Sequence, residues 1–136
     1  GVGAGSAWGA SGGQAGRAVR CVDDVATAAL HRAVLESEAA RHTTLTNVCI
    51  GRLVRGIVNR VMRELGGSGK THFATGLSRA APAFPLATNA MAPLRAAAEK
   101  AGRTDFSPLW SGQNATACLS APAADITRAL AAGFKD

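Results

Sequence analysis

The sequence predicts a mostly α-helical chain with long loops and little strand, which forms one piece of a larger domain. Apolar residues recur at three- and four-residue spacing in several stretches, whereas only one short segment is rich in β-branched residues. Sixteen glycines and 4% aromatic residues leave few large side chains for a core, and much of the 47% hydrophobic fraction is alanine, which buries little area. We therefore expect the 136 residues to fill part of a domain.

The charge and the cysteines narrow the class of protein. The formal net charge of +6 comes mostly from arginine, which suits nucleic acid or an anionic cofactor but also suits solubility alone. Cys21, Cys49 and Cys118 form no CxxC pair, so neither a disulfide framework nor a zinc site is predicted. No apolar run approaches the roughly 20 residues of a membrane span, and no leader-like segment opens the chain. We expect a soluble, cytoplasmic protein with reduced thiols.

The glycine-rich start holds one candidate anion site. Residues 1–5 resemble a dinucleotide fingerprint, but that motif needs a preceding strand, and its last glycine would fall at Ser6. A flexible start is the favoured interpretation. The turn formed by Gln14, Ala15, Gly16 and Arg17 could still contact a phosphate, because glycine lets backbone N–H groups approach an anion closely.

A helix is predicted over residues 24–40, followed by an extended segment. Apolar residues lie at helical spacing there, and Asp24 would cap the positive end of the helix dipole. His31 has no second ligand four residues on, so it is interpreted as a surface or half-buried histidine. Residues 43–49 are β-branched and short, which indicates an extended conformation that Gly51 ends.

The cleanest periodicity predicts an amphipathic helix after Gly51. Its apolar stripe consists of Leu53, Val54, Ile57, Val58, Val61, Met62 and Leu65, with Gly66-Gly67 as the stop. Its basic face carries Arg52, Arg55, Arg60 and Arg63. Those arginines either lie in water or contact phosphates. An alternative function therefore stays open: a non-enzymatic basic helical module that contacts nucleic acid through the arginine face of residues 52–63.

Residues 66–71 imitate the end of a Walker A loop without satisfying it. Glu64 occupies the position of the first glycine, and the loop follows a helix instead of joining a strand to a helix. A loop is predicted over residues 68–90, a helix over 93–100 with Pro93 near its first turn and Gly102 as its stop, and a last helix over 122–132.

Residues 105–114 combine bulky apolar side chains with a small polar turn. Leu109 and Trp110 run directly into the turn at 111–114, which predicts a segment anchored by its ring. The histidines and cysteines form no local nucleophile–base grouping, so no catalytic set is predicted from the residues alone.

Several separate motifs resemble the C-terminal part of the bacterial nitronate monooxygenases, once called 2-nitropropane dioxygenases. They are RC at 20–21, HRA at 31–33, HTTLTNV at 42–48, GR at 51–52, RGIVNR at 55–60, PL at 85–86, APLR at 92–95, FSPLWSGQN at 106–114 and PAA at 122–124. Their order and spacing match the family over about residues 9–134. The resemblance implies an FMN-dependent (β/α)₈ TIM barrel with an added helical tail, which oxidises alkyl nitronates with O₂.

The resemblance also implies a cofactor site. In the family the last barrel strand ends in Gln-x-Gly-Thr, which holds the FMN phosphate, in keeping with phosphate sites after the last strands of barrels. Gln14, Ala15 and Gly16 match this motif, and Arg17 replaces the threonine. The implied domains are residues 1–22, a glycine-rich start with the remnant of the last barrel strand and its phosphate turn, and residues 23–136, the helical tail.

The resemblance leaves part of the family's machinery unmatched. The family's histidine comes from the middle of the barrel, and none of His31, His42 and His72 matches its motif. A complete barrel takes about 250 residues. We therefore expect a C-terminal fragment that is inactive alone, with a small-molecule nitronate and O₂ as the partners of the family, no membrane partner, and no role for nucleic acid under this reading. On the same resemblance, Trp110 anchors the tail's docking point on the barrel.

Overall fold

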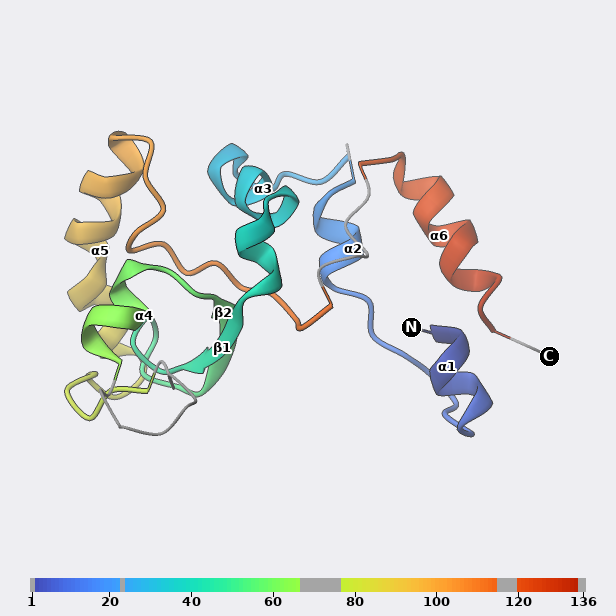
Figure 1. Cartoon of the computed structure of the whole chain (residues 1–136), viewed down its shortest axis with the longest axis horizontal. Coiled ribbons are helices and arrows are strands. Elements are labelled where there is room, and N and C mark those ends of the chain that lie inside the picture. The colour runs from blue at the N-terminus through green and yellow to red at the C-terminus, as the bar shows by residue number, and fades with distance from the viewer. Residues whose placement is uncertain (1, 23, 67–76, 115–119, 135–136) are drawn as a thin grey trace. The chain divides into compact units, whose positions relative to one another are not determined.

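The computed structural model describes residues 2–22, 24–66, 77–114 and 120–134. The chain divides into two compact units (Figure 1). The terminal unit comprises residues 1–27 and 116–136, and the central unit comprises residues 28–115. Along the chain, the central unit is therefore an insertion between the two stretches of the terminal unit. The predicted boundary at residue 22, between a barrel remnant and a helical tail, stays a prediction.

The terminal unit contains three helices, α1 (Val2–Ala7), α2 (Arg17–Arg20) and α6 (Ala123–Ala131). Cys21 and Val22 are fully buried after α2, and Ile126 is the buried residue of α6. The Asp24 carboxylate accepts a hydrogen bond of 3.1 Å from the Ala123 N–H. This bond satisfies one of the N–H groups that the first turn of α6 leaves without a helical partner. The predicted helix over 122–132 is confirmed, whereas the start that was expected to be flexible contains α1.

The central unit is organised around a small antiparallel sheet of β1 (Thr43–Thr46) and β2 (Val54–Ile57). Residues 109–111 extend it on the other edge of β2. The Ile57 N–H donates to the Leu109 carbonyl at 2.9 Å, and the Ser111 N–H donates to the Arg55 carbonyl at 3.3 Å. The segment predicted to be an anchored turn thus adds a short third strand, bridged at Gly56 and Trp110.

The helix predicted after Gly51 is wrong for its first half. Residues 54–57 form β2, and helix α4 covers only Arg60–Leu65. Leu53, the first residue of the predicted stripe, is 62% exposed. Residues 54–57 form a strand because backbone partners lie on both of its edges. The helix begins only after Asn59, whose Oδ1 accepts a hydrogen bond from the Met62 N–H at 3.4 Å and caps α4.

The helix predicted over 24–40 is also shorter than expected. Helix α3 covers Ala29–Glu36, and a 3₁₀ turn, η1, covers Glu38–Arg41. Asp24 does not cap α3, because its carboxylate contacts α6 instead. Extended structure at 43–46 is confirmed as β1, while residues 48–50 form a turn. Gly51 follows with a φ of +81°, a conformation that suits glycine.

Helix α5 (Leu86–Lys100) begins earlier than the helix predicted from Pro93, which lies inside it. Ala87 and Ala98, on either side of Pro93 along the helix, are buried. The predicted stop at Gly102 is confirmed. Gly102, with a φ of +70°, donates to the Glu99 carbonyl, and Arg103 donates to the Ala98 carbonyl, which together form a Schellman motif. Of the loop predicted over residues 68–90, residues 68–76 lie outside the described residues, residues 77–85 belong to no helix or strand, and residues 86–90 belong to α5, where the prediction is wrong.

The core of the central unit lies between the sheet turn, α4 and α5. Val48, Cys49, Val61 and Met62 are buried, and the half-buried residues packed against them are Ile50, Met91, Phe106 and Trp110. Leu109 is more deeply buried than Trp110, so the two residues share the anchoring that the sequence assigned to the ring. None of the described helices is long and apolar enough to cross a bilayer.

Candidate functional site

The predicted phosphate turn lies at the entry to α2. Residues 14–16 are exposed and have no regular structure, and Arg17 is the first residue of α2. Gly16 occupies the N-cap position with φ −104° and ψ −57° and no side-chain cap. Nothing lies within 4 Å of the position that a Cβ of Gly16 would take. An anion can therefore approach this backbone, but the neighbours of Gly16 do not form a cradle around it.

The arginines of residues 52–63 do not form the single helical face that the nucleic-acid alternative requires. Arg55 lies on β2, where its Nη1 donates to the Thr43 Oγ1 at 3.3 Å. Arg60 lies on α4, and its Nε is 2.7 Å from the Glu64 Oε1. Arg52 lies outside both elements and stacks over the Phe84 ring at 4.5 Å. The premise of that alternative is wrong, because the arginines are divided among a loop, a strand and a helix.

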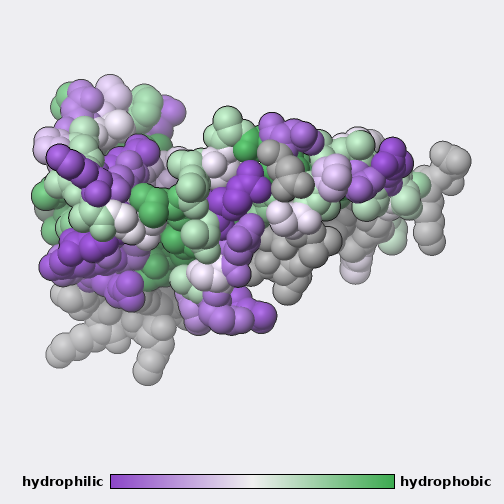
Figure 2. All heavy atoms as spheres, turned by 90° about the horizontal axis from the view of Figure 1, so that it is seen from above, coloured by the Kyte–Doolittle hydropathy of each residue, from purple (hydrophilic) through white to green (hydrophobic). Residues whose placement is uncertain are grey.

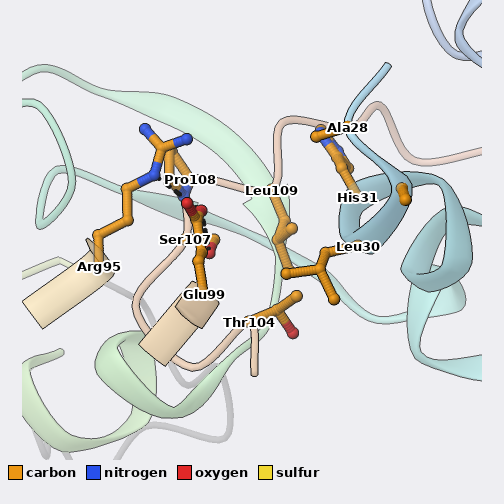
Figure 3. Close-up of a pocket in the computed structure, with 10 residues that line it drawn as sticks. Ala28, Leu30, His31, Arg95, Glu99, Thr104, Ser107, Pro108 and Leu109 are labelled. Atoms are coloured by element: carbon orange, nitrogen blue, oxygen red, sulfur yellow. Dashed lines mark hydrogen bonds and ion pairs between the residues drawn. The ribbon is translucent and has the colours of Figure 1, made fainter. Parts of the chain in front are cut away.

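A cavity of about 300 Å³ opens between α3, α5 and the loop that follows α5 (Figure 3). Its lining residues are Ala28, Ala29, Leu30, His31, Arg95, Glu99, Thr104, Ser107, Pro108 and Leu109. On one wall the Glu99 Oε1 accepts hydrogen bonds from the Ser107 hydroxyl at 2.7 Å and from the Arg95 Nε at 2.8 Å. The bond from Ser107, followed by that from Arg95, holds the pKa of Glu99 below its usual value. The carboxylate thus stays ionised and ties α5 to the loop.

The sequence did not predict this cavity or its polar wall. The sequence contains a pattern that predicts the pairing of Arg95 with Glu99, because opposite charges four residues apart meet on one helix face. No pattern in the sequence predicts the contact of Glu99 with Ser107, since this contact depends on how the loop returns along α5.

Two asparagines fasten loops to the sheet and to α4. The buried Asn59 donates through its Nδ2 to the Ser107 carbonyl at 2.9 Å and to the Thr104 carbonyl at 3.2 Å. Asn47 exchanges two hydrogen bonds with the backbone of Ser78, at 2.9 Å to the carbonyl and 2.8 Å from the N–H. Both asparagines belong to motifs that carried the family resemblance, and both act here on backbone.

The remaining candidates for chemistry are dispersed. His31 lines the cavity, His42 is exposed, and His72 lies outside the described residues. Burial raises the pKa of the Cys49 thiol to about 11, which keeps it protonated and a poor nucleophile at neutral pH. Among the described residues, no three His, Cys, Asp or Glu side chains gather to hold a metal.

Comparison with known proteins identifies the family of the chain. The nitroalkane oxidase from Streptomyces ansochromogenes shares its fold with a TM-score of 0.77 and 32% identity, over 98% of this chain and 35% of that one. The nitronate monooxygenase of Pseudomonas aeruginosa is 35% identical over 123 residues, which are 90% of this chain and 32% of that protein. That of Paraburkholderia phytofirmans is 34% identical over 131 residues, which are 96% of this chain and 33% of that protein.

These matches show that the chain has the fold of one part of an oxidoreductase. The sequence profile of nitronate monooxygenase matches residues 1–133. The chain belongs to the nitronate monooxygenase family. The predicted family and fold class, a mostly helical chain from an α/β family, are confirmed. The chain spans about a third of the length of the relatives that it matches.

Proposed function

We propose that this chain serves the FMN-dependent oxidation of alkyl nitronates by O₂, as one part of a nitronate monooxygenase. The observation that carries the proposal is the family match over residues 1–133. The name of the relatives from Pseudomonas aeruginosa and Paraburkholderia phytofirmans supports a nitronate as the small-molecule substrate. A cytoplasmic location and the absence of a membrane or nucleic-acid partner stay predictions.

FMN is the cofactor of this proposal, and Gln14, Ala15, Gly16 and Arg17 are its candidate phosphate contacts. The exposed backbone of residues 14–16 and the open space beside Gly16 fit an approaching phosphate on one side. Arg17 supplies a positive charge but no hydroxyl, which the threonine of the family motif would supply. When bound, FMN would supply the redox chemistry. The role of these residues would be to hold its phosphate.

We infer that the 136-residue chain is inactive by itself. The chain spans about a third of the length of its relatives. One wall of the cavity between α3 and α5 is a carboxylate whose Oε1 already accepts two hydrogen bonds. The flavin site would thus need further parts of the family fold.

The proposal is tested by measuring FMN binding and nitronate-dependent oxygen uptake. The purified chain is expected to show neither the absorbance of a bound flavin nor turnover, and robust turnover would refute the inactivity of the chain alone. A chimera provides the positive arm, with residues 1–133 replacing the matching stretch of the Pseudomonas aeruginosa enzyme. It should bind FMN and consume O₂ with an alkyl nitronate. A well-folded chimera that binds no flavin would contradict the proposed function.

The candidate phosphate turn is tested in the same chimera. Arg17→Thr restores the hydroxyl of the family motif and should tighten FMN binding. Arg63→Thr removes the same charge from an exposed residue of α4 in the other unit and should leave FMN binding unchanged. Equal effects of the two variants would show that only net charge matters, which would remove Arg17 from the site.

A further inference from the structure

The cavity between α3, α5 and the loop after α5 has a polar side and an apolar side. Arg95 and Glu99 line it from α5, whereas Leu30 lines it from α3 and Leu109 from the third strand (Figure 3). On the viewed face of the molecule, by contrast, hydrophilic and hydrophobic residues are interspersed (Figure 2). Binding sites for small molecules combine an apolar lining with a few convergent polar groups. The cavity therefore has the composition of a ligand site.

The polar side of the cavity has hydrogen-bonding groups left to offer. The Glu99 Oε1 accepts from the Ser107 hydroxyl at 2.7 Å and from the Arg95 Nε at 2.8 Å. Among the described residues, Arg95 and Glu99 make no other hydrogen bond. The Glu99 Oε2 and both Nη groups of Arg95 are thus available to a ligand, and the two side chains are 33% and 47% exposed.

The opposite charges of Arg95 and Glu99 decide which kind of ligand fits. Glu99 is ionised, because the hydrogen bonds from Ser107 and Arg95 lower its pKa. A simple anion would be attracted by Arg95 and repelled by Glu99, and a simple cation would meet the reverse. A molecule that carries a carboxylate and an ammonium group on one carbon is attracted by both residues. The planar guanidinium matches the carboxylate, and the Glu99 Oε2 accepts from the ammonium group.

The volume and the apolar side of the cavity define the rest of the ligand. The cavity measures about 300 Å³, which lies at the lower end of the roughly 300–1,000 Å³ typical of ligand pockets. A short aliphatic side chain would lie against Leu30 and Leu109, where the removal of apolar area from water stabilises the complex.

We propose that this cavity binds a small aliphatic α-amino acid, with its carboxylate on Arg95, its ammonium group on Glu99 and its side chain against Leu30 and Leu109. The proposal depends neither on FMN nor on a nitronate, and the candidate phosphate turn does not contribute to the lining of the cavity. It therefore stands or falls separately from the proposed function.

The ligand is tested with L-leucine and two analogues that each lack one of its charged groups. NMR titration of the 136-residue chain measures the three affinities. L-Leucine should bind with a Kd of about 1 mM or tighter. The first analogue, 4-methylpentanoate, lacks the ammonium group, and the second, leucinamide, lacks the carboxylate. Each should bind about tenfold more weakly than L-leucine, because one charge-assisted hydrogen bond is lost.

The two contacts are tested by comparing ligands within one variant, so that a change in the stability of the variant cancels. Glu99→Gln should remove the preference for L-leucine over 4-methylpentanoate, and Arg95→Gln should remove the preference for L-leucine over leucinamide. Arg60→Gln is the matched control, because Arg60 pairs with Glu64 in the same way on α4 and does not line the cavity. It should leave all three affinities unchanged.

The cavity itself is tested without changing either charge. Ala29 is an exposed residue that lines the cavity, so the ring in Ala29→Phe should occupy the space and abolish the binding of L-leucine. Ala33→Phe, one turn further along α3 and outside the lining, should bind L-leucine as the wild type does. The proposal is wrong if the wild-type chain shows no saturable binding of L-leucine, if Arg60→Gln weakens binding as much as Arg95→Gln, or if binding survives Ala29→Phe.

Discussion

Gly51→Ala should destabilise the central unit more than alanine at any other described glycine of this unit. Gly51 has a φ of +81°, and a Cβ would lie 2.4 Å from both the Phe84 N and the Pro82 carbonyl oxygen. Left-handed backbone costs an L-residue roughly 1–2 kcal/mol. Displacing a packed backbone adds about 1–3 kcal/mol, as other overpacked sites do. The free energy of unfolding should therefore fall by about 2–5 kcal/mol.

Gly102→Ala separates the two contributions. Gly102 has a similar φ of +70°, but nothing lies within 4 Å of the position of its Cβ. Its loss should be the backbone cost alone, about 1–2 kcal/mol. Urea unfolding followed by tryptophan fluorescence measures both, because Trp110 packs on the core of this unit. Equal losses for the two variants would refute the argument that Gly51 is required by the approach of the 82–84 backbone.

Three further predictions concern the polar contacts and the buried thiol. Asn59→Asp keeps the cap acceptor of α4 but loses both donors to the loop, so the free energy of unfolding in urea should fall by about 2–4 kcal/mol; an unchanged midpoint would show that only the cap matters. Because the pKa of Glu99 is lowered, its bond from Ser107 stabilises the fold above pH 4.5, the usual value, and loses that effect as the pH falls through the folded pKa. The difference in unfolding free energy between wild type and Ser107→Ala should accordingly shrink below pH 4.5, and a constant difference would contradict the assignment. With its pKa raised from 9.0 to about 11, Cys49 at pH 9 should be alkylated far more slowly in the native protein than in urea, as read by peptide mass spectrometry; similar rates would count against its burial.

Local signals predicted some elements because nothing distant competes with them. Helix α6 and the stop at Gly102 depend on residues within a few positions of each other, and both were predicted from the sequence. The first half of the helix expected after Gly51 is a strand, because the β-branched Val54 and Ile57 suit a strand as readily as the helical stripe that their spacing predicts. The partners that decide between the two conformations, Thr43 and Leu109, lie far away along the chain.

The sequence also predicted one part of the candidate site and missed another. Turn chemistry and motif spacing located residues 14–17 as a possible anion contact, and the structure leaves their backbone open without enclosing it. Sequence reasoning missed the cavity wall because Glu99 meets Ser107 only after the chain has passed the end of α5. The start of α5 at Leu86 was not predicted, because a proline is common in the first turn of a helix and Pro93 therefore indicated a later start. The burial of Ala87 is not visible in the local sequence.

The family signature at residues 106–114 owes its shape to other signature residues and not to its own turn. Asn59 holds the Ser107 carbonyl, β2 holds Leu109 and Ser111 through backbone hydrogen bonds, and Gly56 leaves only 3.0 Å between its Cβ position and the Leu109 carbonyl oxygen. A side chain at Gly56 would push this third strand away, and an apolar residue at Asn59 would leave buried carbonyls without donors. Residues 55–60 and 106–114 resemble the family together because each is the hydrogen-bonding partner of the other. The constraint that they share is therefore the geometry of the sheet, which fixes where Ser111 and the polar turn after it begin.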